Sequence, residues 1–354
     1  MSKLGIGIYE RRPELVADAN QIGCHTVLLF HYALDLAPQI NTGIEIIGRE
    51  FWGTENQDGM LLSTDLAGLK TLGYWQADTL CQMWPRIDCW VGLNEVMRSG
   101  NLDWLQRQVA FELGFADACQ SHSKTMCAIN APPGVEPLQN EAFFAVYAET
   151  IRPLMAHPAV KYWGRHVYSK SRTAHLWDDA EYYALRHRSI VLGLRQAGVR
   201  VPPIVVTELG WADGWRATGM TDAQAADDLI WYADQVRADT DVHSVHVFGC
   251  GDSGGWHDHD VHDTGMIGRA AAWNVENPVN QPSSNTEVPA MDYGLELQRL
   301  KDIQKQLLDQ NALLTQALRA IRQNKWSGAD GVDGYIVALQ GGAPLGFVPS
   351  FPKA

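Results

Sequence analysis

The chain of 354 residues lacks several features that define common protein classes. Its six cysteines are scattered and none forms a Cys-x-x-Cys pair, so we expect free thiols, as in proteins made in a reducing compartment. No run approaches the roughly 18 apolar residues of a membrane-spanning helix, and no secretory signal follows Met1. The sequence therefore predicts a protein made in the cytoplasm, with no membrane partner.

Clustered positive charge is also missing. The chain has 28 basic and 41 acidic residues, and its formal net charge is −13. Because binding to nucleic-acid phosphates needs a concentrated positive surface, we expect no nucleic-acid partner. Hydrophobic residues make up 46% of the chain, which is enough for a substantial core.

Short β-rich segments alternate with longer segments of helical periodicity through most of the chain. The predicted strands are Leu4–Tyr9, Thr26–His31, Ile44–Glu50, Cys89–Glu95, Thr125–Asn130, Val160–Tyr168, Pro203–Glu208 and Val242–Cys250. The predicted helices are Arg11–Gln21, Asp65–Trp84, Leu102–Ser121, Glu141–Met155, Asp179–Ala197 and Asp222–Ala238. Continuous apolar strands are typical of a parallel sheet covered on both faces. Eight such strands with helical connections predict an α/β fold, a (β/α)8 TIM barrel over residues 1–272.

An open, doubly wound sheet is the competing architecture. Such a sheet usually carries a glycine-rich phosphate loop of the form GxGxxG after its first strand. Here that place is taken by Glu10-Arg11-Arg12-Pro13, so the barrel is preferred.

The composition changes after the barrel. Residues 273–290 are rich in Asn, Pro and Ser, and are predicted to be a linker. Within 291–324, an apolar residue recurs every seven positions at Leu300, Leu307, Leu314 and Ile321. This heptad pattern predicts a coiled-coil helix that makes the protein a homo-oligomer; a single amphipathic helix packed on the barrel is the alternative. Residues 325–354 form a Gly- and Pro-rich C-terminal segment.

Polar side chains end most of the predicted strands, where a barrel enzyme has its active site. In chain order they are His31, Arg49, Asn94, Glu95, Asn130, His166, Tyr168 and Glu208. A charge at the end of an apolar strand costs free energy unless it is paired or used. One such glutamate is readily explained as an ion pair capping the barrel, whereas two with these neighbours indicate a functional site.

Glu95 and Glu208 are suited to glycoside hydrolysis. Two carboxyl groups about 5 Å apart support the retaining mechanism, in which one is the nucleophile and the other acts as acid and then base. Arg49 and Tyr168 are candidates to hold the nucleophile, and Asn94 to bind a sugar hydroxyl. Flat apolar faces for sugar rings are expected from Trp52, Trp211, Trp215 and Trp256. We expect a β-linked oligo- or polysaccharide as substrate, no cofactor and no metal.

Asn94-Glu95 after the fourth predicted strand and Glu208 after the seventh resemble the signature of the clan A glycoside hydrolases. Arg49 after the third strand and His166-Val167-Tyr168 at the end of the sixth also resemble that clan. The resemblance covers roughly residues 1–270. It implies that Glu95 is the acid/base, that Glu208 is the nucleophile and that anomeric configuration is retained.

The chain departs from this pattern at the eighth strand, which often ends in Trp in that clan. Val247-Phe248-Gly249-Cys250 contains no Trp, and Trp256 is the candidate to replace it.

Two motifs point to other functions. Gly251-Asp252-Ser253-Gly254-Gly255 matches the sequence around the nucleophile of trypsin-like proteases, and Thr173-Ala174-His175 is faintly similar to their histidine motif. Those enzymes are all-β double barrels, which the helix-rich pattern does not fit. The loop from His257 to Asp263 alternates His and Asp and suits a divalent metal, although a polar loop lining the substrate cleft is preferred.

A barrel that binds a glycan without cutting it, displayed on an oligomeric stalk, is the alternative function. The presence of both Glu95 and Glu208 disfavours it. A stalk on a protein without a secretory signal suits a phage-borne or other particle-borne protein.

Overall fold

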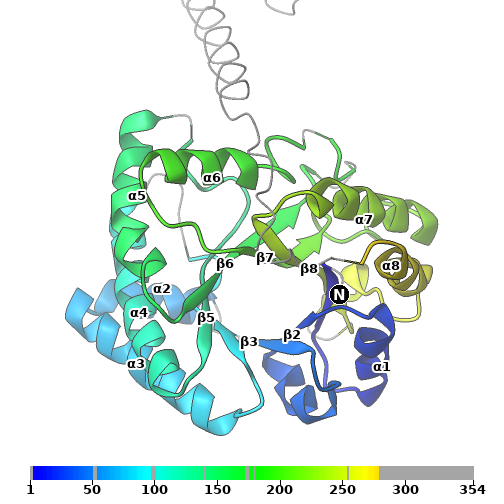
Figure 1. Ribbon diagram of the computed structural model, residues 1–354, viewed down its shortest axis with the longest axis horizontal. Coiled ribbons are helices and arrows are strands. Elements are labelled where there is room, and N and C mark those ends of the chain that lie inside the picture. The colour runs from blue at the N-terminus through cyan, green and yellow to red at the C-terminus, as the bar shows by residue number, and fades with distance from the viewer. Residues whose placement is uncertain are drawn as a thin grey trace, which may run out of the picture. The chain divides into compact units, whose positions relative to one another are not determined.

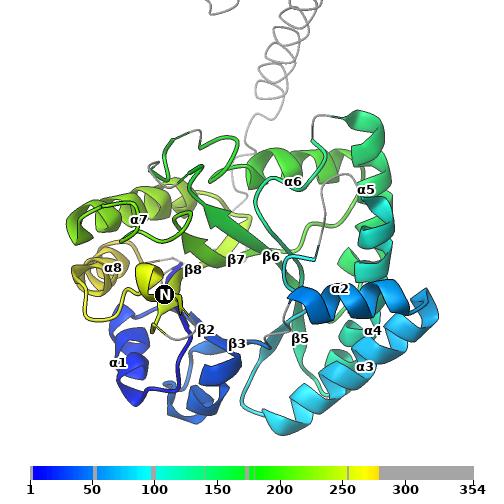
Figure 2. The same ribbon diagram turned by 180° about the vertical axis from the view of Figure 1, so that it is seen from behind.

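The computed structural model describes residues 3–50, 54–96, 101–138, 140–171, 175–178, 180–252 and 255–278 (Figure 1). Its eight strands are parallel and close into a barrel in chain order, with β1 paired to both β2 and β8. The helices lie outside this ring of strands in both views (Figures 1 and 2). The predicted (β/α)8 barrel is confirmed. The predicted helix within 291–324, the segment 325–354 and Trp52 lie outside the described residues.

All eight predicted strands are present. They are β1 (Leu4–Ile8), β2 (Thr26–Phe30), β3 (Glu45–Arg49), β4 (Cys89–Val91), β5 (Thr125–Ala131), β6 (Val160–Tyr168), β7 (Ile204–Gly210) and β8 (Val242–Cys250). The fourth is shorter than predicted, because its ladder to β5 ends at Val91. Beyond that point Asn94 makes an isolated parallel bridge to Asn130, which keeps the segments after β4 and within β5 side by side.

The helices cover the outside of the barrel. They are α1 (Pro13–Ile22), α2 (Thr54–Ser63), α3 (Leu66–Met83), α4 (Leu102–Ser121), α5 (Glu141–Met155), α6 (His187–Gln196), α7 (Asp222–Arg237) and α8 (Gly265–Glu276), with 3-10 helices η1 (His31–Gln39) and η3 (His257–His259). None of the described helices has both the length and the apolar character needed to cross a membrane.

Short-range signals in the sequence set several helix ends. Pro13 opens α1, where its fixed φ suits the first turn, and Gly23 closes the helix at φ 69°. Asn101 and Asn140 cap α4 and α5 through their side-chain oxygens. Thr221 opens α7 in a capping box with Gln224, as its residue type predicts.

Three helical regions differ from the sequence prediction. Helix α6 begins at His187 rather than at Asp179, and residues 180–186 form turns instead. Helices α2 and α8 were not predicted. The last turn of α8 includes residues assigned to the linker, because Trp273 is buried and its indole donates a hydrogen bond to Asp234 at 3.0 Å.

Two apolar layers support the barrel. The larger one lies between the strands and the helices. The smaller one fills the barrel interior from alternate strand positions, such as Leu28 and Phe30 on β2 and Cys89 and Val91 on β4. All six cysteines are buried and free, as the scattered pattern predicts.

Helices α3 and α4 cross at unusually short range. A Cβ added to Gly114 would lie 1.8 Å from the carbonyl oxygen of Lys70, and one added to Gly73 would lie 2.0 Å from that of Phe111. Only glycine permits this approach. On the same helix α4, the side chain of Glu112 accepts a hydrogen bond from the backbone N–H of Ile129 on β5 at 2.8 Å.

Candidate active site

Glu208 on β7 is the most enclosed acid of the site, with a side chain only 5% exposed. Arg49 on β3 pairs with one carboxylate oxygen, and the Tyr168 hydroxyl on β6 donates a hydrogen bond to the other. The Arg49 guanidinium lies 4.7 Å from the centre of the Phe30 ring, which fixes its plane. These contacts stabilise the negative charge of Glu208 and hold both of its oxygens in place.

Arg49 and Tyr168 have protonation states that stabilise the negative charge of Glu208. Burial acts to lower the pKa of Arg49, but the charge of Glu208 raises it, so that the pKa lies above its ordinary value and Arg49 remains a cation. Burial, and then the charge of Glu208, raise the pKa of Tyr168 well above its ordinary value. Tyr168 therefore keeps its proton and, as a phenol, donates a hydrogen bond to the carboxylate.

Glu95 lies in a very different environment. It follows β4 with φ at 52°, in the left-handed region that costs a non-glycine residue on the order of 1 kcal/mol. Its backbone N–H donates to the Asn130 carbonyl at 3.0 Å, which holds this conformation. The Glu95 side chain is 42% exposed, so it exchanges protons with solvent far more readily than Glu208.

His166 on β6 joins the two acids. Its Nδ1 lies 2.6 Å from an oxygen of Glu95 and 3.2 Å from an oxygen of Glu208. The ligand atoms of the three residues all lie within 4.8 Å of one another, which places one oxygen of each glutamate within that distance. The structure thus brings the two predicted catalytic acids together.

A row of polar side chains beneath the acids sets the tautomer of His166. Asn130 Oδ1 accepts a hydrogen bond from the Thr207 hydroxyl at 2.5 Å, which leaves its Nδ2 to donate to Asn94 at 2.7 Å. The same Nδ2 lies 2.9 Å from Nε2 of His166, which must accept. The imidazole proton is therefore on Nδ1, facing the two carboxylates.

Aromatic rings form one wall of the site. Tyr9, directly after β1, stacks on Phe30 at 3.7 Å and meets the edge of Phe248 at 4.7 Å. Trp256 packs edge-on against Phe248 at 5.2 Å and against His259 at 5.4 Å, and remains 39% exposed. The structure thus places Trp256 beside the end of β8, with part of its surface open to solvent.

Sequence reasoning missed Tyr9, and it included His259 only as part of the loop from His257 to Asp263, which it preferred as a polar loop lining the substrate cleft. Burial raises the pKa of Tyr9 well above its ordinary value, with the nearby charge of Glu208 acting in the same direction. Burial lowers the pKa of His259, while Glu208 opposes this effect, so the ring is neutral at pH 7. Tyr9 was recognisable from its position, because it ends a predicted strand as other site residues do. His259 was marked only by the alternation of His and Asp in its loop.

Three other predicted residues have polar partners other than the two acids. His31 opens η1, is 41% exposed and pairs with Glu50. Trp211 and Trp215 are buried, and their indoles donate to Asp228 and to the Asp260 carbonyl.

The expectation that Trp211 offers a sugar-binding face is wrong. A buried indole N–H needs a partner, and Asp228 supplies one at 2.9 Å on the side facing the helices. The parallel barrel also excludes the double β-barrel fold of trypsin-like proteases.

A scan with protein-family models finds no match to this chain, and neither does a search of curated proteins. Among solved structures, it is similar to a family 39 glycoside hydrolase from Bacteroides cellulosilyticus WH2, with a TM-score of 0.53 and 11% identity over 77% of this chain and 63% of that chain. It is also similar to a family 128 (subgroup I) endo-β-1,3-glucanase from Amycolatopsis mediterranei in complex with laminarihexaose, with a TM-score of 0.50 and 12% identity over 77% of this chain and 99% of that chain. The chain shares its barrel fold with these glycoside hydrolases. At such low identity the likeness concerns the fold, which agrees with the resemblance to clan A drawn from the sequence.

Proposed function

We propose that this protein is a retaining glycoside hydrolase that acts on a β-linked oligo- or polysaccharide. The observation that carries the proposal is the spacing of Glu95 and Glu208, which have carboxylate oxygens within 4.8 Å of each other. Carboxyl groups lie about 5–5.5 Å apart in retaining enzymes, and about 6.5–9.5 Å apart in inverting enzymes, where a water must fit between them.

The difference in burial between the acids assigns their roles. Glu208 is enclosed, and its charge is held by Arg49 and Tyr168, so it is the nucleophile that attacks the anomeric carbon. Glu95 is open to solvent, so it is the acid that protonates the departing glycosidic oxygen. The products of this step are a released sugar or aglycone and an ester between Glu208 and the remaining sugar.

The second step reverses these proton movements. Glu95, now a carboxylate, takes a proton from a water molecule that attacks the anomeric carbon and breaks the ester to Glu208. His166 faces both carboxylates through the N–H at Nδ1, and so stabilises whichever of them carries the negative charge. Asn94 and Trp256 lie where they can contact the sugar, and β-1,3-glucans are the first substrates to test because one similar structure holds laminarihexaose.

The test uses a panel of aryl β-glycosides and cell-envelope polysaccharides, together with β-1,3-glucans. Glu208→Gln and Glu95→Gln are each expected to reduce kcat by several orders of magnitude with an unchanged circular dichroism spectrum. The first product, read by NMR before mutarotation, is expected to have the β configuration. A Glu208→Ala variant that hydrolyses at the normal rate refutes the proposal. Glycan binding by the natural chain without any product favours the non-catalytic alternative.

We also propose that residues 291–324 form a coiled coil that makes the protein a homo-oligomer. The heptad spacing from Leu300 to Ile321 supports this assembly. Sedimentation equilibrium of the full chain tests it, and a monomer at micromolar concentration refutes it.

A further inference from the structure

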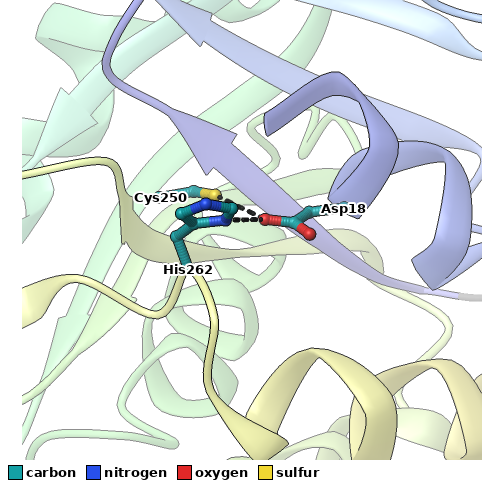
Figure 3. A group of neighbouring side chains, drawn as sticks. All are labelled: Asp18, Cys250 and His262. Carbon is teal, nitrogen blue, oxygen red and sulfur yellow. Dashed lines mark hydrogen bonds and ion pairs between the residues drawn. The ribbon is translucent and has the colours of Figure 1, made fainter. Parts of the chain in front are cut away.

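A second group of chemically reactive side chains lies outside the candidate active site. Asp18 on α1, Cys250 at the end of β8 and His262 before α8 converge although they are far apart in the sequence (Figure 3). His262 Nδ1 lies 2.6 Å from Asp18 Oδ2, and Cys250 Sγ lies 3.5 Å from the same oxygen. The three ligand atoms all lie within 4.8 Å of one another.

The donor atoms of this group match those preferred by zinc. A thiolate sulfur, an imidazole nitrogen and a carboxylate oxygen are the three ligand types that Zn²⁺ takes in proteins. Cys250 is fully buried, and the side chains of Asp18 and His262 are 14% and 11% exposed. A cation held there is therefore largely shielded from water, while solvent still reaches one side of the group.

The backbone around the group is fixed by a single carboxylate. Asp260 Oδ1 accepts hydrogen bonds from Gly251 N and from His262 N, both at 2.9 Å. One oxygen atom therefore holds both Gly251, which follows Cys250, and His262. Outer contacts of this kind orient the ligands of protein metal sites.

The local charge favours a cation. Asp18 and Asp260 lie in or beside the group, and Asp263 Oδ2 lies 3.4 Å from Nε2 of His262. The nearby guanidinium of Arg12 is engaged by Glu14 at 2.7 Å and by Glu10 at 3.3 Å.

The group formed by Glu95, His166 and Glu208 differs in this respect. There the buried Arg49 pairs directly with Glu208 and opposes a second positive charge. Of the two groups, only the one around Cys250 therefore has the charge balance of a cation site.

We propose that Asp18, Cys250 and His262 form a binding site for a thiophilic divalent cation, with Zn²⁺ as the best fit. On binding, the Cys250 thiol releases its proton to solvent, and the proton of His262 moves from Nδ1 to Nε2, which faces Asp263. The metal then forms bonds to Sγ, to His262 Nδ1 and to a carboxylate oxygen of Asp18, with water as the fourth ligand. The metal joins α1 to β8 where β1 and β8 close the barrel. It also steadies the loop that carries His259, so its role is structural.

The test is a titration of the full chain, after treatment with a chelator, with Co²⁺ and then Zn²⁺. We expect one equivalent of Co²⁺ per chain and a sulfur-to-cobalt charge-transfer band, which Zn²⁺ then displaces. Cys250→Ser and Asp18→Asn are expected to lower the affinity by at least about 100-fold, because each removes or weakens a ligand. The matched control is Cys24→Ser, a buried thiol beside the same helix α1 that contacts the Ala19 carbonyl instead.

Several outcomes overturn the proposal. One is the absence of the charge-transfer band from the natural chain, which decides the matter even where a variant fails to fold. Another is an equal loss of affinity in the Cys24→Ser control. A third is binding that survives in Cys250→Ser but disappears in Glu208→Gln, because that result places the metal at the two catalytic acids.

Discussion

Glu112 on α4 provides the sharpest test of how the fold holds the candidate active site. Its side chain is fully buried, and its carboxylate accepts hydrogen bonds from the backbone N–H of Ile129 at 2.8 Å and from the Gln108 amide at 2.8 Å. The backbone N–H of Leu93 is a third donor. Leu93 and Ile129 directly precede Asn94 and Asn130, so this one carboxylate anchors both strand ends that support Glu95.

The pKa of Glu112 gives the expected pH dependence. Burial raises it to about 7, although the three hydrogen bonds oppose the effect. Because the pKa is higher in the folded than in the unfolded chain, the contribution of Glu112 is complete below pH 4.5 and is lost as the pH rises towards 7. The difference between about 7 and the ordinary 4.5 corresponds to about 3 kcal/mol of unfolding free energy.

The Glu112→Gln variant removes this titration. In the variant, the amide nitrogen of the new side chain lies opposite a backbone N–H, which then has no acceptor. This is expected to lower the free energy of unfolding by about 1–3 kcal/mol at low pH. Urea unfolding at several pH values between 4.5 and 7.5 measures both effects. We expect the stability of the natural chain relative to the variant to fall by about 3 kcal/mol as the pH rises through this range, so that the variant becomes equally or more stable at pH 7.5.

The activity of the same variant gives an independent readout. Loosening of Leu93 and Ile129 displaces Glu95, so kcat is expected to fall while KM changes little. Gln108→Ala is the matched control, because it removes one neutral donor and leaves the titrating group in place. A stability gap that does not vary with pH refutes the assigned protonation of Glu112, and an unchanged kcat refutes its positioning role.

Three further changes test other parts of the structure. Arg49→Leu leaves Glu208 buried without its counter-charge and is expected to lower the free energy of unfolding in urea by about 3–5 kcal/mol. Adding Glu208→Gln should restore part of this loss, and a double variant with no recovery contradicts the pairing. Gly114→Ala forces a Cβ against the facing helix and is expected to lower the free energy of unfolding by about 1–3 kcal/mol. The control Gly268→Ala lies on the exposed side of α8 with no atom near its Cβ, and is expected to raise that free energy by up to about 1 kcal/mol. Trp256→Ala should raise KM by up to about tenfold and leave kcat unchanged, because a stacked ring contributes about 1 kcal/mol to sugar binding; an unchanged KM removes Trp256 from the site.

The proximity of Glu95 and Glu208 was predictable because its signal is local. An apolar strand that ends in a carboxylate is visible in the sequence, and the strand count assigns Glu95 to β4 and Glu208 to β7. Parallel strands in a closed barrel then bring these ends together without any further information. The tautomer of His166 was not predictable, since it depends on hydrogen bonds across β5 to β7.

Trp211 shows where local reasoning failed. Side chains alternate along a strand, so with Glu208 facing the interior, Leu209 and Trp211 face the helices. The alternation of side-chain directions can be read from the sequence, but the prediction for Trp211 considered only that it follows a strand.

The helices that were not predicted have a different cause. The apolar residues of α2 do not follow helical spacing, and α8 is revealed by packing of Trp273 against α7.

Among the described residues, the side chains that pair with or hydrogen-bond to Glu208 come from strands rather than from long loops. Arg49 lies on β3, and His166 and Tyr168 lie on β6. If the proposed hydrolase activity holds, the reacting groups and the sugar-binding loop are therefore separate parts of this molecule. Exchange of the loop that carries Trp256 is then expected to change the glycan that is bound while Glu208 and its partners stay on the rigid sheet.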